Sequence, residues 1–271
     1  MTQFQDLTRL SKQLRLDVLQ MIKHAGSGHL AGSLGMADVF AYFYHQVLNH
    51  RPQEPQWSDR DYFLLSAGHI CPVWYATLAR FNYFDPQLLS TLRQLNSPLQ
   101  GHPKRNPDLG IENTSGPLGQ GISMAAGLAY GLQQAGKKNQ VFVVSSDGEQ
   151  QEGQVWEAYL FVTHYHLKNL TIIIDCNGIQ ASGRVSQVMS IADLKDKLLA
   201  FNFAVGVVDG HDFANIDEVW QSLVSVEHPK VLLCQTTPAK GISFMENDHY
   251  WHSKIPDNQQ YQQALTELEG S

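Results

Sequence analysis

Short apolar runs bounded by turn residues recur along this chain, and longer amphipathic segments separate them. Runs of this kind are typical of strands that are buried on both faces of a parallel sheet. We therefore predict strands at residues 62–66, 141–145, 170–175, 203–208 and 231–235. The intervening segments predict helices at residues 36–48, 72–84, 118–135, 151–166, 191–199 and 216–226. Apolar residues at helical spacing predict a further amphipathic helix at the N-terminus, carried by Leu7, Leu10, Leu14, Val18 and Met21.

The alternation of strands and helices predicts an α/β fold, a doubly wound and mostly parallel sheet flanked by helices. Ligands of such folds gather at the carboxyl ends of the strands. The sequence contains no internal repeat, low-complexity tract or Pro/Ser-rich linker, so we expect residues 1–271 to form a single domain. The segments 94–116 and 236–256 are predicted to be long loops, and loops of this length are usually functional.

Composition and charge exclude several classes of protein. The formal net charge is −7 at pH 7, which gives no electrostatic reason to expect nucleic acid or an anionic membrane as a partner. No apolar run approaches the roughly 20 residues that span a bilayer, and the N-terminal segment lacks the apolar core of a signal peptide. The three cysteines show no metal-type pairing and fit reduced thiols, so we expect a cytoplasmic protein.

Polar residues follow two of the predicted strands. Asp147 and Gly148 follow the strand at 141–145 after one further residue, and Asn177 follows the strand at 170–175 in the same way. If one helical crossover joins these strands as neighbours, Asp147 and Asn177 emerge side by side. Mg²⁺ prefers oxygen ligands and often combines one or two side chains with phosphate and water. Asp-Gly and Asn-Gly are also ordinary turn residues, but their pairing across one crossover favours a metal site, with Gly148 leaving room for a phosphate.

Three of the twelve histidines lie in glycine-flanked loops, which suits close approach to a ligand. His29, His69 and His102 each follow a glycine, and an imidazole can relay protons near neutral pH. We assign no function to the following histidines: His24, His45, His50, His164, His166, His211 and His228.

The segment "TSGPLGQG" (114–121) does not match the Gly-x-Gly-x-x-Gly fingerprint, so a nicotinamide site is not expected. Its glycines instead predict a turn that opens a helix near Leu118 and presents backbone N–H groups to a ligand. Glu152 opens the following helix, where the helix dipole favours a carboxylate. Glu149 is predicted to be a solvated surface acid.

Several motifs together resemble the transketolase family. "SSDGEQQEGQVWEA" and "DCNGIQASG" resemble its version of the thiamine diphosphate motif, with Ser146 at the place of the first glycine. "TTPAKGISFMENDHYWHSKIP" resembles a further family stretch, except that Pro238 replaces a lysine and Ser253 a glycine. The remaining matches, in the family's order, are "SGHLAGSLGMAD", "LLSAGH", "QGHP" and "TSGPLGQGIS".

The resemblance implies thiamine diphosphate as cofactor and Mg²⁺, or Ca²⁺ or Mn²⁺ in its place. It assigns the metal to Asp147, Asn177 and the Ile179 carbonyl. His29 and His69 would surround the reacting centre, and His102 would contact the donor sugar. Further cofactor contacts are implied for Gly116, Pro117, Leu118, Gly148, Lys240 and His252. The resemblance also places Glu152 in a carboxylate network that links cofactor sites across a subunit interface.

The resemblance covers the first domain of the family, and we expect no pyrimidine-binding or C-terminal domain in this chain. It therefore implies the N-terminal subunit of a split transketolase, inactive without a partner that carries the pyrimidine-binding domain. The expected assembly is a heterotetramer of two plus two chains that acts on sugar phosphates. The alternatives are half of a 1-deoxyxylulose-phosphate synthase-like or 2-oxo acid dehydrogenase-like enzyme, a transketolase-like enzyme for an unusual sugar phosphate, and a non-catalytic regulatory subunit.

Overall fold

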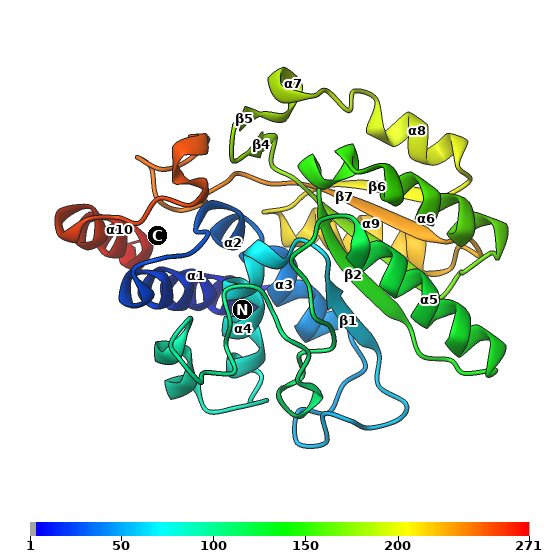
Figure 1. Ribbon diagram of the computed structural model, residues 1–271, viewed down its shortest axis with the longest axis horizontal. Coiled ribbons are helices and arrows are strands. Elements are labelled where there is room, and N and C mark those ends of the chain that lie inside the picture. Colours follow the sequence, from blue (N-terminus) through cyan, green and yellow to red (C-terminus); the bar gives the residue numbers. More distant parts are fainter. Residues whose placement is uncertain (1–3, 271) are drawn as a thin grey trace.

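A five-stranded, fully parallel sheet forms the centre of the computed structural model, which describes residues 4–270. Its strand order is β1–β2–β3–β7–β6 (Figure 1). The strands are β1 (Tyr62–Leu65), β2 (Val141–Ser146), β3 (Leu170–Cys176), β6 (Ala204–Asp209) and β7 (Lys230–Gln235). Each predicted strand is confirmed to within one residue at either end. A small antiparallel hairpin, β4 (Ile179–Gln180) and β5 (Gly183–Arg184), was not predicted.

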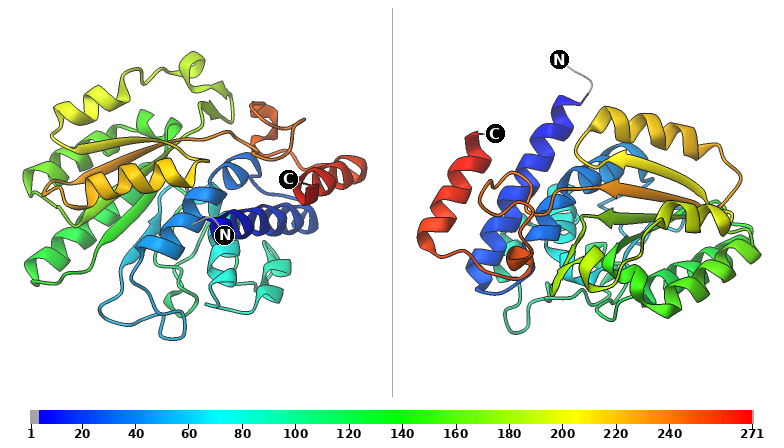
Figure 2. Two further views of the ribbon diagram at one scale, coloured as in Figure 1. Left: turned by 180° about the vertical axis from the view of Figure 1, so that it is seen from behind. Right: turned by 90° about the horizontal axis from the view of Figure 1, so that it is seen from above.

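Two hydrophobic cores lie on opposite faces of this sheet, because successive side chains of each strand point to opposite faces. Leu64 and Val143 pack under α5 (Gln120–Gln134), α6 (Gly153–His164) and α8 (Leu194–Ala200). Phe63 and Phe142 pack on the other face, under α3 (Ala37–Tyr42) and α9 (Phe213–Val224). Figure 2 shows α9 and the α5–α6 pair on opposite sides of the strands. The doubly wound α/β fold is therefore confirmed.

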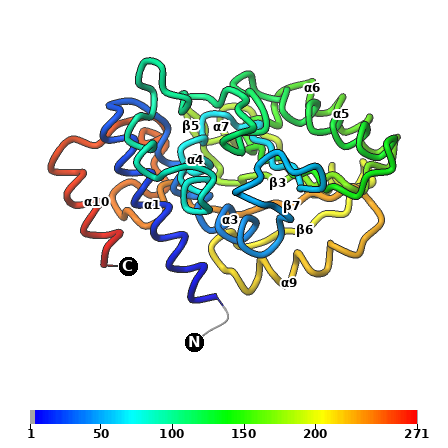
Figure 3. The backbone as a smooth tube through the Cα atoms, turned by 90° about the horizontal axis from the view of Figure 1, so that it is seen from below, coloured from blue at the N-terminus to red at the C-terminus, as the bar shows by residue number. Residues whose placement is uncertain are grey.

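The second core continues beyond the sheet into a group of helices at one end of the molecule. This group contains α1 (Gln5–Ala25), α2 (Ala31–Gly35), α4 (Cys71–Arg80) and α10 (Asn258–Gly270). Helix α1 is the predicted amphipathic helix, and α10 lies beside it (Figure 3). A last short helix, α7 (Val185–Val188), follows the β4–β5 hairpin. No helix within residues 4–270 is long and apolar enough to cross a membrane.

Each of the six predicted helical segments overlaps a helix, but several helices are shorter than predicted. The segment 36–48 divides into α3 and a π-helical turn, Phe43–Val47. The segment 151–166 begins its α-helix at Gly153, after a 3-10 turn at Gly148–Gln151. The loops predicted at 94–116 and 236–256 contain turns, short 3-10 helices and one isolated β-bridge between Asn106 and Ile111. These loops and the strand ends surround the candidate site.

Candidate functional site

A cleft of about 370 Å³ opens at the carboxyl ends of the first three strands. It is lined by most of the residues that the sequence predicts for a site: His29, His69, His102, Gly116, Leu118, Gly148, Glu152, Asn177, Ile179 and His252. A larger groove of about 740 Å³ lies between α1 and the 3-10 helix Pro86–Thr91, but it contains none of these residues. The chemistry-bearing side chains therefore identify the smaller cleft as the candidate active site.

Four imidazoles meet in this cleft from four separate segments. The ring centroid of His29 lies 5.4 Å from that of His69, 6.0 Å from that of His102 and 5.3 Å from that of His252. The rings of His69 and His252 are 5.2 Å apart. The structure thus brings together all four histidines that the sequence analysis selected, from positions far apart in the chain.

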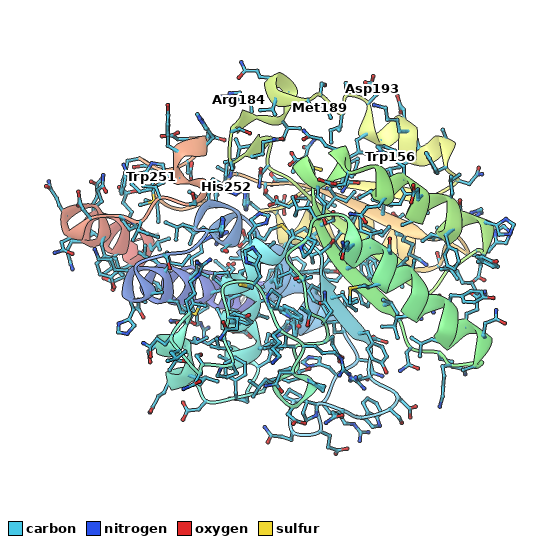
Figure 4. All side chains as sticks on the ribbon, in the orientation of Figure 1. Trp156, Arg184, Met189, Asp193, Trp251 and His252 are labelled. Carbon is cyan, nitrogen blue, oxygen red and sulfur yellow. The ribbon has the colours of Figure 1, made fainter. Side chains whose placement is uncertain are left out.

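The elements around the cleft explain how each imidazole reaches it. His29 precedes α2, and His69 lies in a 3-10 turn, Gly68–Ile70, that follows β1. His102 is exposed within the 94–116 loop. His252 ends a 3-10 helix that Asp248 caps by accepting a hydrogen bond from the Tyr250 N–H. Figure 4 shows His252 beside Trp251, at the end of the 236–256 segment that contacts α2.

Burial keeps these imidazoles neutral. Burial, with smaller effects from the neighbouring imidazoles, lowers the pKa of His69 to about 3. Burial also lowers the pKa of His29 to about 4, with smaller effects from His252 and the Arg93 cation. The pKa values of His102 and His252 are lowered for the same main reason. Neutral imidazoles can accept a proton or form hydrogen bonds at pH 7.

Asp147 and Asn177 follow neighbouring strands, as expected, because β2 pairs directly with β3. The Asp147 carboxylate accepts hydrogen bonds from the N–H groups of Gly148 and Gly178, both at 2.7 Å. The side-chain oxygen of Asn177 accepts from the Ile179 N–H at 3.0 Å. Burial raises the pKa of Asp147 to about 6. The two strand ends therefore form one hydrogen-bonded unit, in which Asn177 lines the cleft and Asp147 is buried behind the lining residues.

The prediction that Glu149 is a solvated surface acid is wrong, because its side chain is fully buried. Its carboxylate accepts hydrogen bonds from the Ser66 hydroxyl, the Gly119 N–H at 2.6 Å and the Ser145 hydroxyl at 2.7 Å. It thus connects the ends of β1 and β2 to the start of α5. Burial raises the pKa of this carboxyl group, and these hydrogen bonds oppose the rise.

The start of α5 differs from the predicted arrangement. The helix begins at Gln120, and the Gly119 N–H points to Glu149 rather than to an open ligand site. Gly119 has a positive φ of 82°, a conformation that favours glycine. Gly121 allows close packing, because a Cβ atom there would lie 2.5 Å from the Cα of Ser66. The glycines of this motif therefore serve the close approach of α5 to the end of β1.

Three predicted cofactor residues differ in how they face the cleft. Glu152 is exposed at the rim and forms the N-cap of α6. Pro117 is exposed and is not among the lining residues, although its neighbours Gly116 and Leu118 are. Lys240 is half-buried in the 236–256 segment and does not line the cleft either. Two residues that differ from the family pattern lie near these positions. Ser146 lines the cleft, and Pro238 is buried.

The sequence analysis missed Asp175, which lies directly beneath the cleft. Asp175 is buried and accepts hydrogen bonds from Thr236 and from the Asn177 amide, the latter at 2.7 Å. Burial raises its pKa to about 7, and the nearby Asp147 contributes. A charged residue that ends an otherwise apolar strand was the signal that could have identified it.

A family model described as the transketolase, thiamine diphosphate binding domain, matches residues 7–267. The chain belongs to this family. Among the transketolase relatives, the 6-deoxy-6-sulfo-D-fructose transketolase subunit of Clostridium sp. (strain MSTE9) is 34% identical over 268 residues, which cover 97% of this chain and 96% of that protein. An apulose-4-phosphate transketolase subunit of Phocaeicola vulgatus is 32% identical over 267 residues, which cover 98% of this chain and 95% of that protein.

Solved transketolases have the same fold. The transketolase of Campylobacter jejuni matches with a TM-score of 0.91 and 29% sequence identity. The match covers 98% of this chain but only 43% of that chain. This chain therefore spans almost the full length of the two subunit relatives and less than half of the complete transketolase.

Proposed function

We propose that this chain is the thiamine diphosphate-binding N-terminal subunit of a split transketolase. With a partner subunit, it would transfer a two-carbon ketol unit from a ketose phosphate to an aldose. The observation that carries this proposal is the convergence of four imidazoles with Asp147 and Asn177 at one edge of the sheet. The near-complete coverage of two relatives named as transketolase subunits supports the split organisation.

Unpartnered polar groups in the cleft and directly beside it fit a polar cofactor. His29 Nδ1 and the Ser115 hydroxyl are among the described atoms that are buried without a hydrogen-bond partner. Buried polar groups are normally hydrogen-bonded, so a ligand that supplies partners here would remove a cost of about 1–3 kcal/mol for each group. We assign Gly116, Pro117 and Leu118 to the aminopyrimidine side of thiamine diphosphate, and His69 and His29 to the reacting centre.

A divalent metal fits the other end of the cleft. We propose that Asp147, the Asn177 side-chain oxygen and the Ile179 carbonyl hold Mg²⁺, with Ca²⁺ or Mn²⁺ able to replace it. No group of three His, Cys, Asp or Glu side chains within residues 4–270 is arranged to hold a metal. The remaining oxygens would therefore come from diphosphate and water, as is usual for Mg²⁺. Gly148 leaves room for a phosphate, and His252, which lines the cleft, is a better phosphate contact than Lys240.

The histidines would then carry the proton transfers. When bound, thiamine diphosphate supplies the carbanion that adds to a ketose carbonyl and permits cleavage of the adjacent C2–C3 bond. His29 and His69 are neutral at pH 7, so they can accept or return a proton at the substrate oxygen. His102 is exposed at the mouth of the cleft and would contact hydroxyl groups of the donor sugar.

A partner would complete the site. The resemblance places the glutamate that activates the cofactor in the pyrimidine-binding domain, which we do not expect within residues 1–271, proposed here to form one domain. We propose a cytoplasmic heterotetramer of two plus two chains, in which the exposed Glu152 joins a carboxylate network across the interface. Activity assays of this chain alone, of the partner alone and of the mixture, each with thiamine diphosphate and Mg²⁺, test this. Appreciable turnover by the lone chain would contradict the proposal.

The metal assignment gives a separate prediction. Asp147→Ala should weaken Mn²⁺ binding to the assembled complex at least about 100-fold, because removal of one ionised ligand from a site with two side-chain ligands leaves little affinity. Electron paramagnetic resonance with Mn²⁺ and thiamine diphosphate measures this directly. Glu157→Gln, an exposed change on α6, is the control and should bind Mn²⁺ like the parent protein. Equal Mn²⁺ affinity of the Asp147 variant would refute the metal site.

The donor sugar of the proposed reaction can be identified with an activity assay. The two subunit relatives are named for different sugars, 6-deoxy-6-sulfo-D-fructose and apulose 4-phosphate. We therefore propose that the co-expressed pair be assayed against a panel of ketose phosphates and sulfo-sugars. Turnover of any ketose donor with an aldose acceptor supports ketol transfer. Decarboxylation of a 2-oxo acid in its place would favour the alternative thiamine enzymes.

A further inference from the structure

His211 was given no function from the sequence, but the structure places its ring between two important segments. The residue lies in the turn between β6 and α9. Its Nδ1 atom lies 2.8 Å from a carboxylate oxygen of Asp38 in α3. On the other side, the Thr237 N–H donates to Nε2 at 2.7 Å. His211 therefore bridges α3 and the first residues of the segment that ends in His252.

These contacts allow only one tautomer of His211. Because a backbone N–H can only donate, Nε2 must provide a lone pair and the ring proton must be on Nδ1. Asp38 is the matching acceptor, and Arg15 fixes this carboxylate with two guanidinium nitrogens. Burial alone would raise the pKa of Asp38, but the hydrogen bond from His211 and the Arg15 charge bring it to about 2. The bridge is thus held in one orientation from Arg15 to Thr237.

The backbone that His211 holds contacts both halves of the cleft. Thr236 donates from its hydroxyl to Asp175, whose other oxygen accepts from the Asn177 amide. Ala239 donates its N–H to the Ala31 carbonyl at 2.8 Å, two residues after His29. A Cβ atom on Gly35 of α2 would lie 3.0 Å from the Thr237 carbonyl oxygen, so α2 packs directly on this segment. Residues 236–239 therefore connect the Asn177 turn to the His29 segment.

We propose that His211 is a positioning residue that fixes residues 236–239 and, through them, sets the spacing between the Asn177 turn and the His29 segment. The consequence for cofactor affinity rests on the function proposed above. The hydrogen-bonded bridge itself is independent of that function, because all of its residues belong to this chain. The buried Pro238 lies between the two backbone N–H groups that are held in this way, those of Thr237 and Ala239.

Three variants separate the two halves of the bridge. His211→Phe keeps an aromatic ring but removes both contacts, His211→Asn keeps only a donor near Asp38, and His211→Gln places an acceptor where Nε2 was. Hydrogen exchange of the full chain should be about tenfold faster at the Thr237 and Ala239 amides in the Phe and Asn variants, because a hydrogen bond contributes up to about 1.4 kcal/mol, which corresponds to tenfold. The Gln variant should stay within about threefold of the parent.

Cofactor binding gives the second measurement. Calorimetry with thiamine diphosphate and Mg²⁺ on the assembled complex should show affinity about tenfold weaker for His211→Phe, with partial recovery for His211→Gln. Glu112→Gln is the matched control, because it breaks a comparably buried pair with Arg60 near the opposite end of β1. It should lower the free energy of unfolding without changing exchange at residue 237 or cofactor affinity.

Each outcome decides the inference. Exchange at Thr237 and Ala239 that matches the parent in His211→Phe, or affinity loss that Glu112→Gln reproduces, would overturn it. If a variant does not fold, ¹⁵N shifts of the His211 ring in the parent chain still test it, and a proton on Nε2 would overturn it. If the parent complex binds no thiamine diphosphate, the proposed function fails while the exchange result still decides the role of His211.

Discussion

Single side chains at the strand ends determine how the cleft is held together. Glu149 has a fully buried carboxylate with hydroxyl and N–H donors from three segments. Glu152, three positions later, is exposed at the rim. In the sequence, only the position of Glu152 at a predicted helix start distinguished these two acids. That position does not reveal that the Glu149 carboxylate accepts hydrogen bonds from residues far away in the chain.

The buried acid gives a direct prediction. Glu149→Gln should lower the free energy of unfolding by about 2–3 kcal/mol, because an amide NH₂ group would face one of the donors that the carboxylate now satisfies. Glu152→Gln, an exposed change, should stay within about 0.5 kcal/mol of the parent. Urea unfolding of the chain measures both. Similar stability of the two variants would show that the Glu149 hydrogen bonds contribute little.

The imidazoles predict how stability depends on pH. The pKa values of His69 and His29 are lowered to about 3 and about 4, so the unfolded chain binds protons that the folded chain does not. The contribution of these two imidazoles to stability should therefore fall as the pH decreases from about 6.5 to about 4, whereas the raised pKa values of Asp147 and Asp175 act in the opposite direction. His69→Gln should lose about 1–2 kcal/mol less between pH 7 and pH 5, as measured by urea unfolding. An identical pH profile for this variant would contradict the neutral state of His69.

At the scale of elements, the strands were the most predictable part of the fold. The strands are buried on both faces of the sheet, so the apolar runs in the sequence match the strand boundaries in the structure. The missed elements are short, except for α10, a mostly exposed helix of 13 residues. Helix α2 has five small or apolar residues with no polar face, and the β4–β5 hairpin has two residues in each strand. Their positions depend on contacts with segments far away in sequence, which periodicity does not record.

The parts of the candidate site that could be predicted are those in which a local sequence pattern identifies the residue. Glycine-flanked histidines and the residues after strands identified most of the cleft lining. Asp175 and His211 were missed because their roles depend on partners more than 20 residues away, Thr236 and Thr237. Such pairings follow from the sheet order, in which β3 lies beside β7. The apolar pattern of the strands does not encode that order, so these pairings could not be predicted from it.

Two glycines of α5 provide a matched test of packing. Gly121→Ala would place a Cβ atom 2.5 Å from the Ser66 backbone, and should destabilise the chain by about 1–3 kcal/mol. Gly127→Ala on the same helix meets nothing within 4 Å and should stabilise it by about 0.5–1 kcal/mol. Thermal unfolding of the two variants should therefore give shifts of opposite sign. Shifts of the same sign would show that α5 does not pack on Ser66 as described.

At the scale of the whole molecule, the proposed partner determines what the chain can do. Its match covers 43% of the Campylobacter jejuni transketolase, and two-fold assemblies are the commonest closed form of oligomers. Light scattering of the co-expressed pair should give a mass equal to two copies of each chain. A stable complex of one plus one that is fully active would contradict the heterotetramer.

The strand order also has a consequence for synthesis of the protein. Strand β7 is the last strand in the chain, yet it lies between β3 and β6. Until residues 230–235 leave the ribosome, one edge of the apolar strand β3 has no partner and β6 cannot join the sheet. Unpaired edges of this kind promote aggregation of incomplete chains. Translational pauses after β3 and before β7 should therefore reduce the yield of soluble chain more than pauses earlier in the message.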